Sequence, residues 1–99
     1  MVTEIAQIKV IAGREKAFEE AVAQAAPHFQ AAKGYISLNL EKCIEDPSIY
    51  RLVVEWETLD NHMVDFRDSE GFAAWRALAS PHFAEPPQVV HTENVFKAV

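Results

Sequence analysis

Apolar and polar residues alternate along four segments of the chain, and this two-residue period predicts a β-strand in each. The four segments are residues 2–11, 35–44, 50–57 and 88–96. In the first three, one side of the alternation is richer in apolar residues, so we expect that side to face a core. It consists of Glu4, Ala6, Ile8 and Val10 in the first segment, Ile36, Leu38, Leu40 and Ile44 in the second, and Tyr50, Leu52, Val54 and Trp56 in the third.

Apolar residues that recur every three or four positions predict a helix after the break at "AGRE". This stripe consists of Phe18, Ala21, Val22, Ala25 and Phe29. Pro27 has no N–H for the hydrogen-bond ladder of a helix, so we expect a kink or an early end there.

Two shorter helical pieces are expected between residues 58 and 79, joined at "DSEG". Thr58 and Ser69 can each accept a hydrogen bond at a helix N-terminus. The first piece would place Leu59, Met63 and Phe66 on one face. The second piece carries Phe72, Trp75, Leu78 and Ala79.

The resulting element order is βαββαβ, which predicts an α+β, ferredoxin-like fold for one domain over residues 1–99. Both helices should cover one face of an antiparallel sheet. The other face mixes apolar with polar side chains, namely Ile5, Tyr35 and Val53 with Gln7, Asn39 and Arg51. Such a face should meet a second subunit, so we expect a homodimer whose two sheets close into a barrel. A folded monomer of this mass should expose about 5,700 Å².

Composition narrows the function classes. The formal net charge of −6 argues against nucleic acid as a partner, because phosphate binding needs a basic face. A single cysteine, Cys43, forms no intramolecular disulfide and provides no metal-ligand spacing. The N-terminal residues lack the pattern of a signal peptide, and no apolar run approaches the roughly 20 residues of a membrane span. We therefore expect a cytoplasmic protein without membrane contact.

The sequence resembles the antibiotic biosynthesis monooxygenase family along nearly its whole length. The stretches that carry the resemblance are "IKVIAGREKAFEEAVAQ", "LVVEWETLDNH", "SPHF" and "EPPQV". The resemblance implies a dimeric α+β barrel and an activity like that of the family's cofactor-free oxygenases. These act on quinols and polyketide aromatics by deprotonating a phenolic substrate, which then passes an electron to O2. The resemblance therefore implies a protein that works without a cofactor and without a metal.

The family also has a haem-degrading branch, which uses an Asn, a Trp and a His. The corresponding positions here are Ala6, Phe66 and Arg76, and none of the three matches. Haem handling is therefore a third and weaker hypothesis, with His62 and His82 as the remaining candidate iron ligands.

The candidate site residues are His62 as a catalytic base and Asn39, Arg51, Phe66 and Trp75 as substrate-binding groups. Histidine titrates near neutral pH, aromatic side chains can enclose a planar substrate, and Asn or Arg can hold its oxygens. Each also has a simpler explanation. His62 can be a boundary residue with a hydrogen bond, the aromatic side chains can be core, and Arg51 can pair with a glutamate of a neighbouring strand.

The sequence thus predicts a cofactor-independent monooxygenase that acts on a small aromatic molecule or quinol. The expected pocket lies between the sheet and the second helical segment. The alternative from another class is a non-catalytic dimeric module that binds a small apolar ligand or serves in a stress response. We expect His28 at the surface. His91 lies on the last strand, and the sequence leaves open which face of the sheet it is on.

Overall fold

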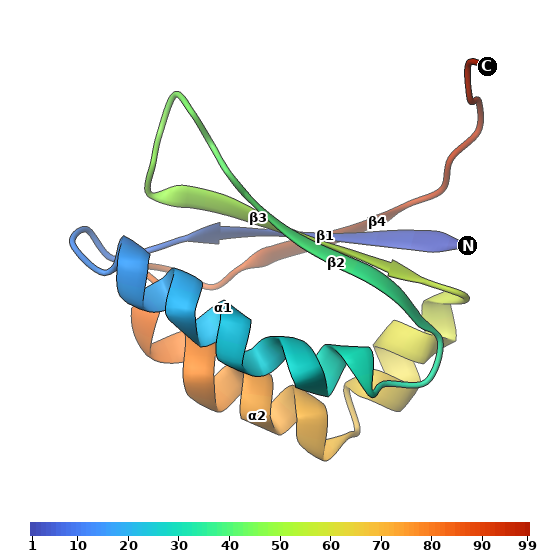
Figure 1. Cartoon of the computed structure of the whole chain (residues 1–99), viewed down its shortest axis with the longest axis horizontal. Coiled ribbons are helices and arrows are strands. Elements are labelled where there is room, and N and C mark those ends of the chain that lie inside the picture. The colour runs from blue at the N-terminus through green and yellow to red at the C-terminus, as the bar shows by residue number, and fades with distance from the viewer.

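The chain forms two layers, a four-stranded antiparallel sheet and a layer of helices that covers one of its faces (Figure 1). This computed structural model describes all residues 1–99. The elements in chain order are β1 (Val2–Lys9), α1 (Glu15–Gln30), β2 (Tyr35–Lys42), β3 (Ile49–Trp56), the π-helix η1 (Asn61–Phe66), α2 (Glu70–Ala79), the short 3₁₀ helix η2 (Ser80–His82) and β4 (Gln88–Thr92). The sheet order is β2-β3-β1-β4, which confirms the predicted ferredoxin-like α+β fold. None of the helices is long and apolar enough to cross a membrane.

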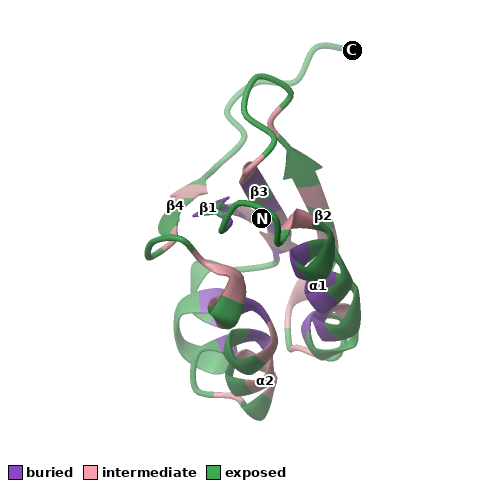
Figure 2. Cartoon of the chain, turned by 90° about the vertical axis from the view of Figure 1, so that its left-hand side faces the viewer, coloured by how far each residue is buried: buried purple, intermediate pink, exposed green.

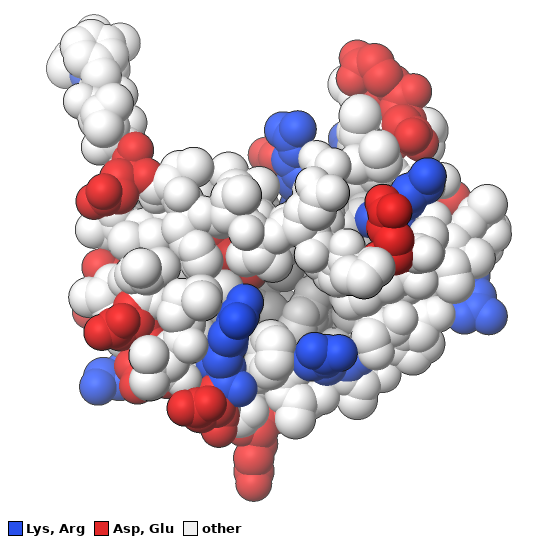
Figure 3. All heavy atoms as spheres, turned by 180° about the vertical axis from the view of Figure 1, so that it is seen from behind, with Lys and Arg blue, Asp and Glu red and all other residues white.

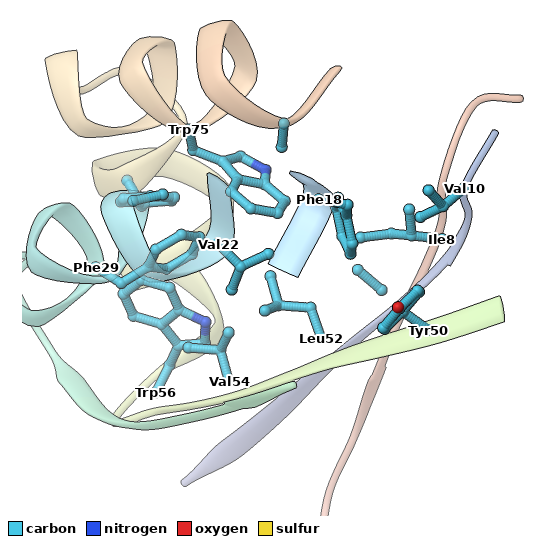
Figure 4. Close-up of a cluster of buried hydrophobic side chains, with 14 residues drawn as sticks. Ile8, Val10, Phe18, Val22, Phe29, Tyr50, Leu52, Val54, Trp56 and Trp75 are labelled. Carbon is cyan, nitrogen blue, oxygen red and sulfur yellow. The ribbon is translucent and has the colours of Figure 1, made fainter. Parts of the chain in front are cut away.

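The core lies between the sheet and the helices, where the predicted faces of β1, β3 and α1 meet (Figures 2 and 4). The α1 stripe is buried as expected, and its five residues are the buried residues of that helix. The largest fully buried side chains are Trp56, Tyr50, Phe18, Phe29, Ile8, Leu52, Val10 and Val54. The two-residue and 3.6-residue periods therefore locate most of the core.

Pro27 neither ends nor shortens α1, contrary to one of the two expected outcomes. The helix runs on to Gln30, and the backbone N–H of Ala31 still donates to the Pro27 carbonyl. Pro27 leaves the carbonyl of Ala23 without its helical donor. Both residues are on the exposed side of α1, where water can bind that carbonyl.

The face assignment of β2 was wrong at its start. A register shift between Tyr35 and Ser37 breaks the alternation, so Tyr35 packs against the core while Ile36 is 43% exposed. Ile44 lies beyond the end of the strand in the β2–β3 loop and is also exposed. A β-bulge adds one residue to one strand of a pair, which exchanges the two faces at that point.

The first short helical piece also differs from the prediction. It is a π-helix, in which the N–H of Arg67 donates to the His62 carbonyl 3.2 Å away, five residues earlier. Leu59 and Met63 are 45% and 38% exposed, whereas His62 and Phe66 are buried. The wider turn thus points Leu59 and Met63 outward, leaves Phe66 in the core and brings the histidine inward.

Asn61 anchors the start of η1 against the loop before β2. Its Oδ1 accepts hydrogen bonds from the backbone N–H and the hydroxyl of Thr58, and its Nδ2 donates to Asp65. Gly34 lies directly against this amide at a φ of +80°, and a Cβ at that position would overlap the Asn61 side chain. Gly34 therefore meets two requirements, a left-handed backbone and a close approach.

The sheet face opposite the helices is uncovered (Figure 2). Paired positions place Ile5 beside Val53 and Val90 in an apolar row across three strands. In the neighbouring row, Gln7 lies beside Arg51 and Gln88. The C-terminal residues and the β2–β3 loop both project from this side (Figure 1).

The two left-handed glycines give a matched test of the Gly34–Asn61 contact. Gly13 has a φ of +91° and open space where a Cβ would stand. Gly13→Ala should therefore cost only the backbone strain, about 1 kcal/mol. Gly34→Ala should cost at least about 2 kcal/mol more, because it also displaces Asn61 and the start of η1. Urea unfolding measures both, and equal losses would show that the contact contributes nothing.

Candidate active site

A pocket of about 510 Å³ opens between the sheet and α2, in the region expected from the sequence. Its apolar wall comes from both layers and consists of Ala6, Ile8, Leu52, Phe72, Trp75, Phe83 and Val89. Its polar lining includes Glu4, His62, Arg67 and Arg76. Figure 3 shows this side of the molecule, with a hollow between white walls and basic side chains at its rim.

Glu4 is the most unusual group in this pocket, because it lies on the core face of β1 in a row of apolar residues. It is only 5% exposed, and its Oε1 accepts a hydrogen bond of 3.0 Å from the indole N–H of Trp56. Burial disfavours the charged carboxylate and raises the pKa of Glu4 to about 7. The Trp56 hydrogen bond and the nearby Arg67 act in the opposite direction. At neutral pH this carboxyl can therefore either give up or accept a proton.

His62 lies beside Glu4, with its Nε2 3.3 Å from the Glu4 Oε1. Its ring stacks on Trp56 at 5.6 Å between centroids and is almost fully buried. Burial is the main reason that the pKa of His62 falls to about 4, with His91 and Arg67 adding to the effect. Near neutral pH the imidazole is therefore uncharged, and its Nε2 lies close to the Glu4 carboxyl without forming an ion pair.

His91 extends the pair from the other side. The register of β4 on β1 places it opposite Glu4, and its Nε2 lies 2.8 Å from the Nδ1 of His62. The ring is half-buried, and burial followed by the charge of Arg67 lowers the pKa of His91. Three groups that are far apart in sequence thus lie in one line, in which the Nε2 of His62 is 3.3 Å from Glu4 and its Nδ1 is 2.8 Å from His91.

Two arginines contribute positive charge to the pocket. Arg67 follows η1, and Arg76 lies on α2. Neither has a carboxylate within 4.0 Å, since the pairs of basic and acidic side chains within that distance are Lys42–Glu19 and His62–Glu4. Both guanidinium groups are therefore available to an anionic group in the pocket.

The structure brings together some of the predicted site residues and separates others. His62 and Trp75 line the pocket. Phe66 is 2% exposed and does not line it, because it packs behind the pocket against Phe29, Trp56 and Phe72.

Asn39 and Arg51 do not line the pocket that His62 lines, and their predicted role in substrate binding stays a prediction. Both lie on the uncovered face of the sheet, because strand residues of their parity point away from the helices. Arg51 is exposed there and has no salt bridge with a glutamate within 4.0 Å, although Glu41 is its cross-strand neighbour.

Sequence reasoning missed the roles of Glu4, His91 and Arg67. Glu4 left a signal, because it is the one charged residue on the otherwise apolar core face of the first strand. Buried carboxyls of this kind are uncommon and often functional. No sequence pattern indicated His91 or Arg67. The position of His91 depends on the register of β4 on β1, and that of Arg67 depends on the π-turn of η1.

The haem hypothesis gains no support from these positions. Ala6 and Arg76 do line the pocket, but Phe66 lies in the core. Both ring nitrogens of His62 already face a partner, Glu4 on one side and His91 on the other. His82 does not line the pocket.

A concave pocket with apolar walls and a few convergent polar groups is the usual form of a small-ligand site. The family model described as "Antibiotic biosynthesis monooxygenase" matches residues 1–78. The chain therefore belongs to the antibiotic biosynthesis monooxygenase family.

Known relatives agree with this assignment. The uncharacterized Bacillus subtilis protein YczJ is 42% identical over 95 residues, which cover 96% of this chain and all of YczJ. A Bordetella bronchiseptica crystal structure that bears the family's name is 54% identical, with a TM-score of 0.94 and coverage of 96% of this chain and 97% of that one. SnoaB of Streptomyces nogalater, a cofactor-independent oxygenase, is 17% identical with a TM-score of 0.84 over 97% of this chain and 94% of its own, a likeness that shows the fold alone.

The opposite pKa shifts of Glu4 and His62 predict a distinctive dependence of stability on pH. The raised pKa of Glu4 gives stability that is present below about pH 4.5 and is lost as pH rises through about 7. The lowered pKa of His62 gives stability that is present above about pH 6.5 and is lost as pH falls through about 4. Between these limits the two contributions have opposite slopes and largely cancel.

Removing either group should expose the slope of the other. Relative to wild type, the free energy of unfolding of Glu4→Gln should rise by about 2 kcal/mol from pH 4.5 to 6.5. That of His62→Gln should fall by a similar amount over the same window. Denaturant unfolding at several pH values measures both differences. Curves that stay parallel to wild type would contradict the assigned shifts.

Proposed function

We propose that this protein is a cofactor-independent monooxygenase that oxidises a small aromatic molecule or quinol with O2. The observation that carries the proposal is the Glu4–His62 pair, which faces an otherwise largely apolar pocket. A pocket that only binds an apolar ligand has no need for two buried titratable groups, whose burial is costly. An enzyme that must remove a proton from its substrate does need them.

The reaction begins with transfer of a phenolic proton to the Glu4 carboxylate, with His62 holding that carboxylate in place. The substrate anion then gives an electron to O2, and the two radicals combine to a peroxide. In a substrate such as an anthrone, which carries a reactive CH2 group, loss of water leaves a carbonyl, so that the CH2 group and O2 become C=O and H2O. All four electrons come from the substrate. The family membership and the cofactor-independent chemistry of SnoaB support this course.

The shape and charge of the pocket fit such a substrate. Its volume lies within the range of about 300–1,000 Å³ that is usual for small-ligand sites. Phe72, Trp75 and Phe83 supply aromatic walls for a planar ring. The charges of Arg67 and Arg76 favour the anion that deprotonation produces.

An oxygen electrode tests the activity with naphthohydroquinones, anthrones and catechols as substrates. Rates are corrected for oxidation in buffer. With the best substrate, Glu4→Gln and His62→Ala should each lower kcat by about 100-fold or more, because each removes part of the proton acceptor. His28→Ala is the matched control, since this histidine is exposed on α1 and should leave kcat unchanged.

Two results would contradict the proposal. Oxygen uptake that Glu4→Gln and His62→Ala leave intact would remove the pair from the reaction. Tight binding of the aromatic compounds without oxygen uptake by wild type would favour the non-catalytic binding module.

We further propose that the working form is a homodimer joined through the uncovered sheet face. The chain exposes 6334 Å², compared with about 5,700 Å² for a globular monomer of this mass. The row of Ile5, Val53 and Val90 lies on this face, and the C-terminal residues Val95 and Phe96 are 95% and 80% exposed. The C-terminal residues and the β2–β3 loop rise on the same side, so a second copy on this face would lie between them (Figure 1).

Light scattering tests the dimer at micromolar concentration. Wild type should have twice the mass of the 11.1 kDa chain. Val53→Glu places a charge in the apolar row and should shift the equilibrium to monomer. Val64→Glu, at an exposed valine of η1, should stay dimeric. A wild-type mass of one chain would refute the proposal.

A further inference from the structure

The proposed reaction uses the Glu4–His62 pair but leaves His91 unexplained. His91 does not line the pocket, yet its Nε2 lies 2.8 Å from the Nδ1 of His62. It comes from β4, which pairs with β1 alone and therefore forms an edge of the sheet. The line from Glu4 through His62 to His91 thus runs from the pocket to a half-buried ring at the sheet edge.

We propose that Glu4, His62 and His91 form a proton relay that connects the pocket with water at the β4 edge, and that His91 is its outer end. The relay deepens the proposed function and rests on it for its use in turnover. The alignment of the three side chains does not itself depend on that function.

The line can hold its protons in two arrangements, one with Glu4 protonated and one with Glu4 ionised. When Glu4 is protonated, its O–H donates to the Nε2 of His62, and the Nδ1–H of His62 donates to the Nε2 of His91. Movement of both protons outward leaves a Glu4 carboxylate that accepts from the Nε2–H of His62. His91 then carries a proton on each nitrogen and releases the Nδ1 proton to water. One proton has left the pocket, and Glu4 is again a base. The peroxide anion formed from the substrate takes up one proton from water before it loses H2O, so the whole reaction releases no net proton.

The surroundings of the line favour this exchange over a fixed ion pair. The groups that face Glu4 are the indole N–H of Trp56, His62, His91 and the charge of Arg67. Arg67 also acts on both imidazoles, and its positive charge disfavours the imidazolium form of each. Neither ring is therefore a fixed cationic partner for Glu4.

The arrangement is also unlike that of a metal-ligand set. The ring nitrogens of His62 point in opposite directions, one toward Glu4 and the other toward His91. The three groups are thus placed to hand a proton from one to the next, and they do not converge on a common point.

Nuclear magnetic resonance of the imidazole nitrogens tests the relay without any assay of turnover. In wild type, ionisation of Glu4 near pH 7 should exchange the tautomers of both rings, so His91 should show this transition in addition to its own. In Glu4→Gln and in His62→Gln, His91 should lose the additional transition. The His28 resonances serve as an internal control. A backbone spectrum confirms that each variant is folded.

Turnover provides the second arm. In His91→Gln, kcat should fall about tenfold at unchanged KM, because Glu4 is reset more slowly. Free imidazole in the buffer should restore part of the rate, whereas a purely structural role would not respond to it. His28→Gln should behave as wild type.

The two arms separate the possible failures. An absence of oxygen uptake by wild type would refute the proposed function while the resonance titration still decides the relay. A His91 titration that is identical in wild type, Glu4→Gln and His62→Gln would overturn the relay whatever the enzymatic result.

Discussion

The burial of one carboxyl group, that of Glu4, governs the chemistry of this molecule. A charge at this depth is expensive unless it is compensated, and the chain compensates it only in part. Trp56 donates one hydrogen bond and the Nε2 of His62 lies 3.3 Å away, while Arg67 contributes charge from farther away. The balance raises the pKa of Glu4 into the neutral range, where proton exchange is easiest. A fully paired carboxylate would be a better structural element and a poorer base.

The rest of the fold holds the partners of this carboxyl in place. β1 supplies Glu4, the end of β3 supplies Trp56, and β4 supplies His91 through its register on β1. His62 depends on the π-turn of η1, which in turn depends on the contact of Asn61 with Gly34. π-turns inside helices often occur at functional sites, because they re-aim a side chain at a local cost in hydrogen bonding. The loop before β2 therefore contributes to the site although none of its residues lines the pocket.

The sequence predicted the parts of the structure that follow from regular periodicity. The α1 stripe and the core faces of β1 and β3 repeat with the helical or strand period, and the element order then leaves few topologies. The same reasoning failed where the backbone is irregular. The bulge at Tyr35 exchanged faces in β2, and the π-turn reversed the expected orientation of Leu59, Met63 and His62. His62 and Trp75 could be predicted at the pocket from their residue types and from their position in the second helical segment alone. The Glu4–His91 contact required the β1–β4 register, which no local pattern encodes.

The stacking of Trp56 on His62 has an optical consequence. Its indole ring lies against an imidazole and donates its N–H to a carboxyl, so its electronic surroundings change whenever either neighbour gains or loses a proton. The chain has one other tryptophan, Trp75, which lines the pocket. The two indoles therefore act as separate intrinsic chromophores. The absorption and fluorescence of Trp56 should respond to protonation of Glu4 or His62, and those of Trp75 should respond to a ligand in the pocket.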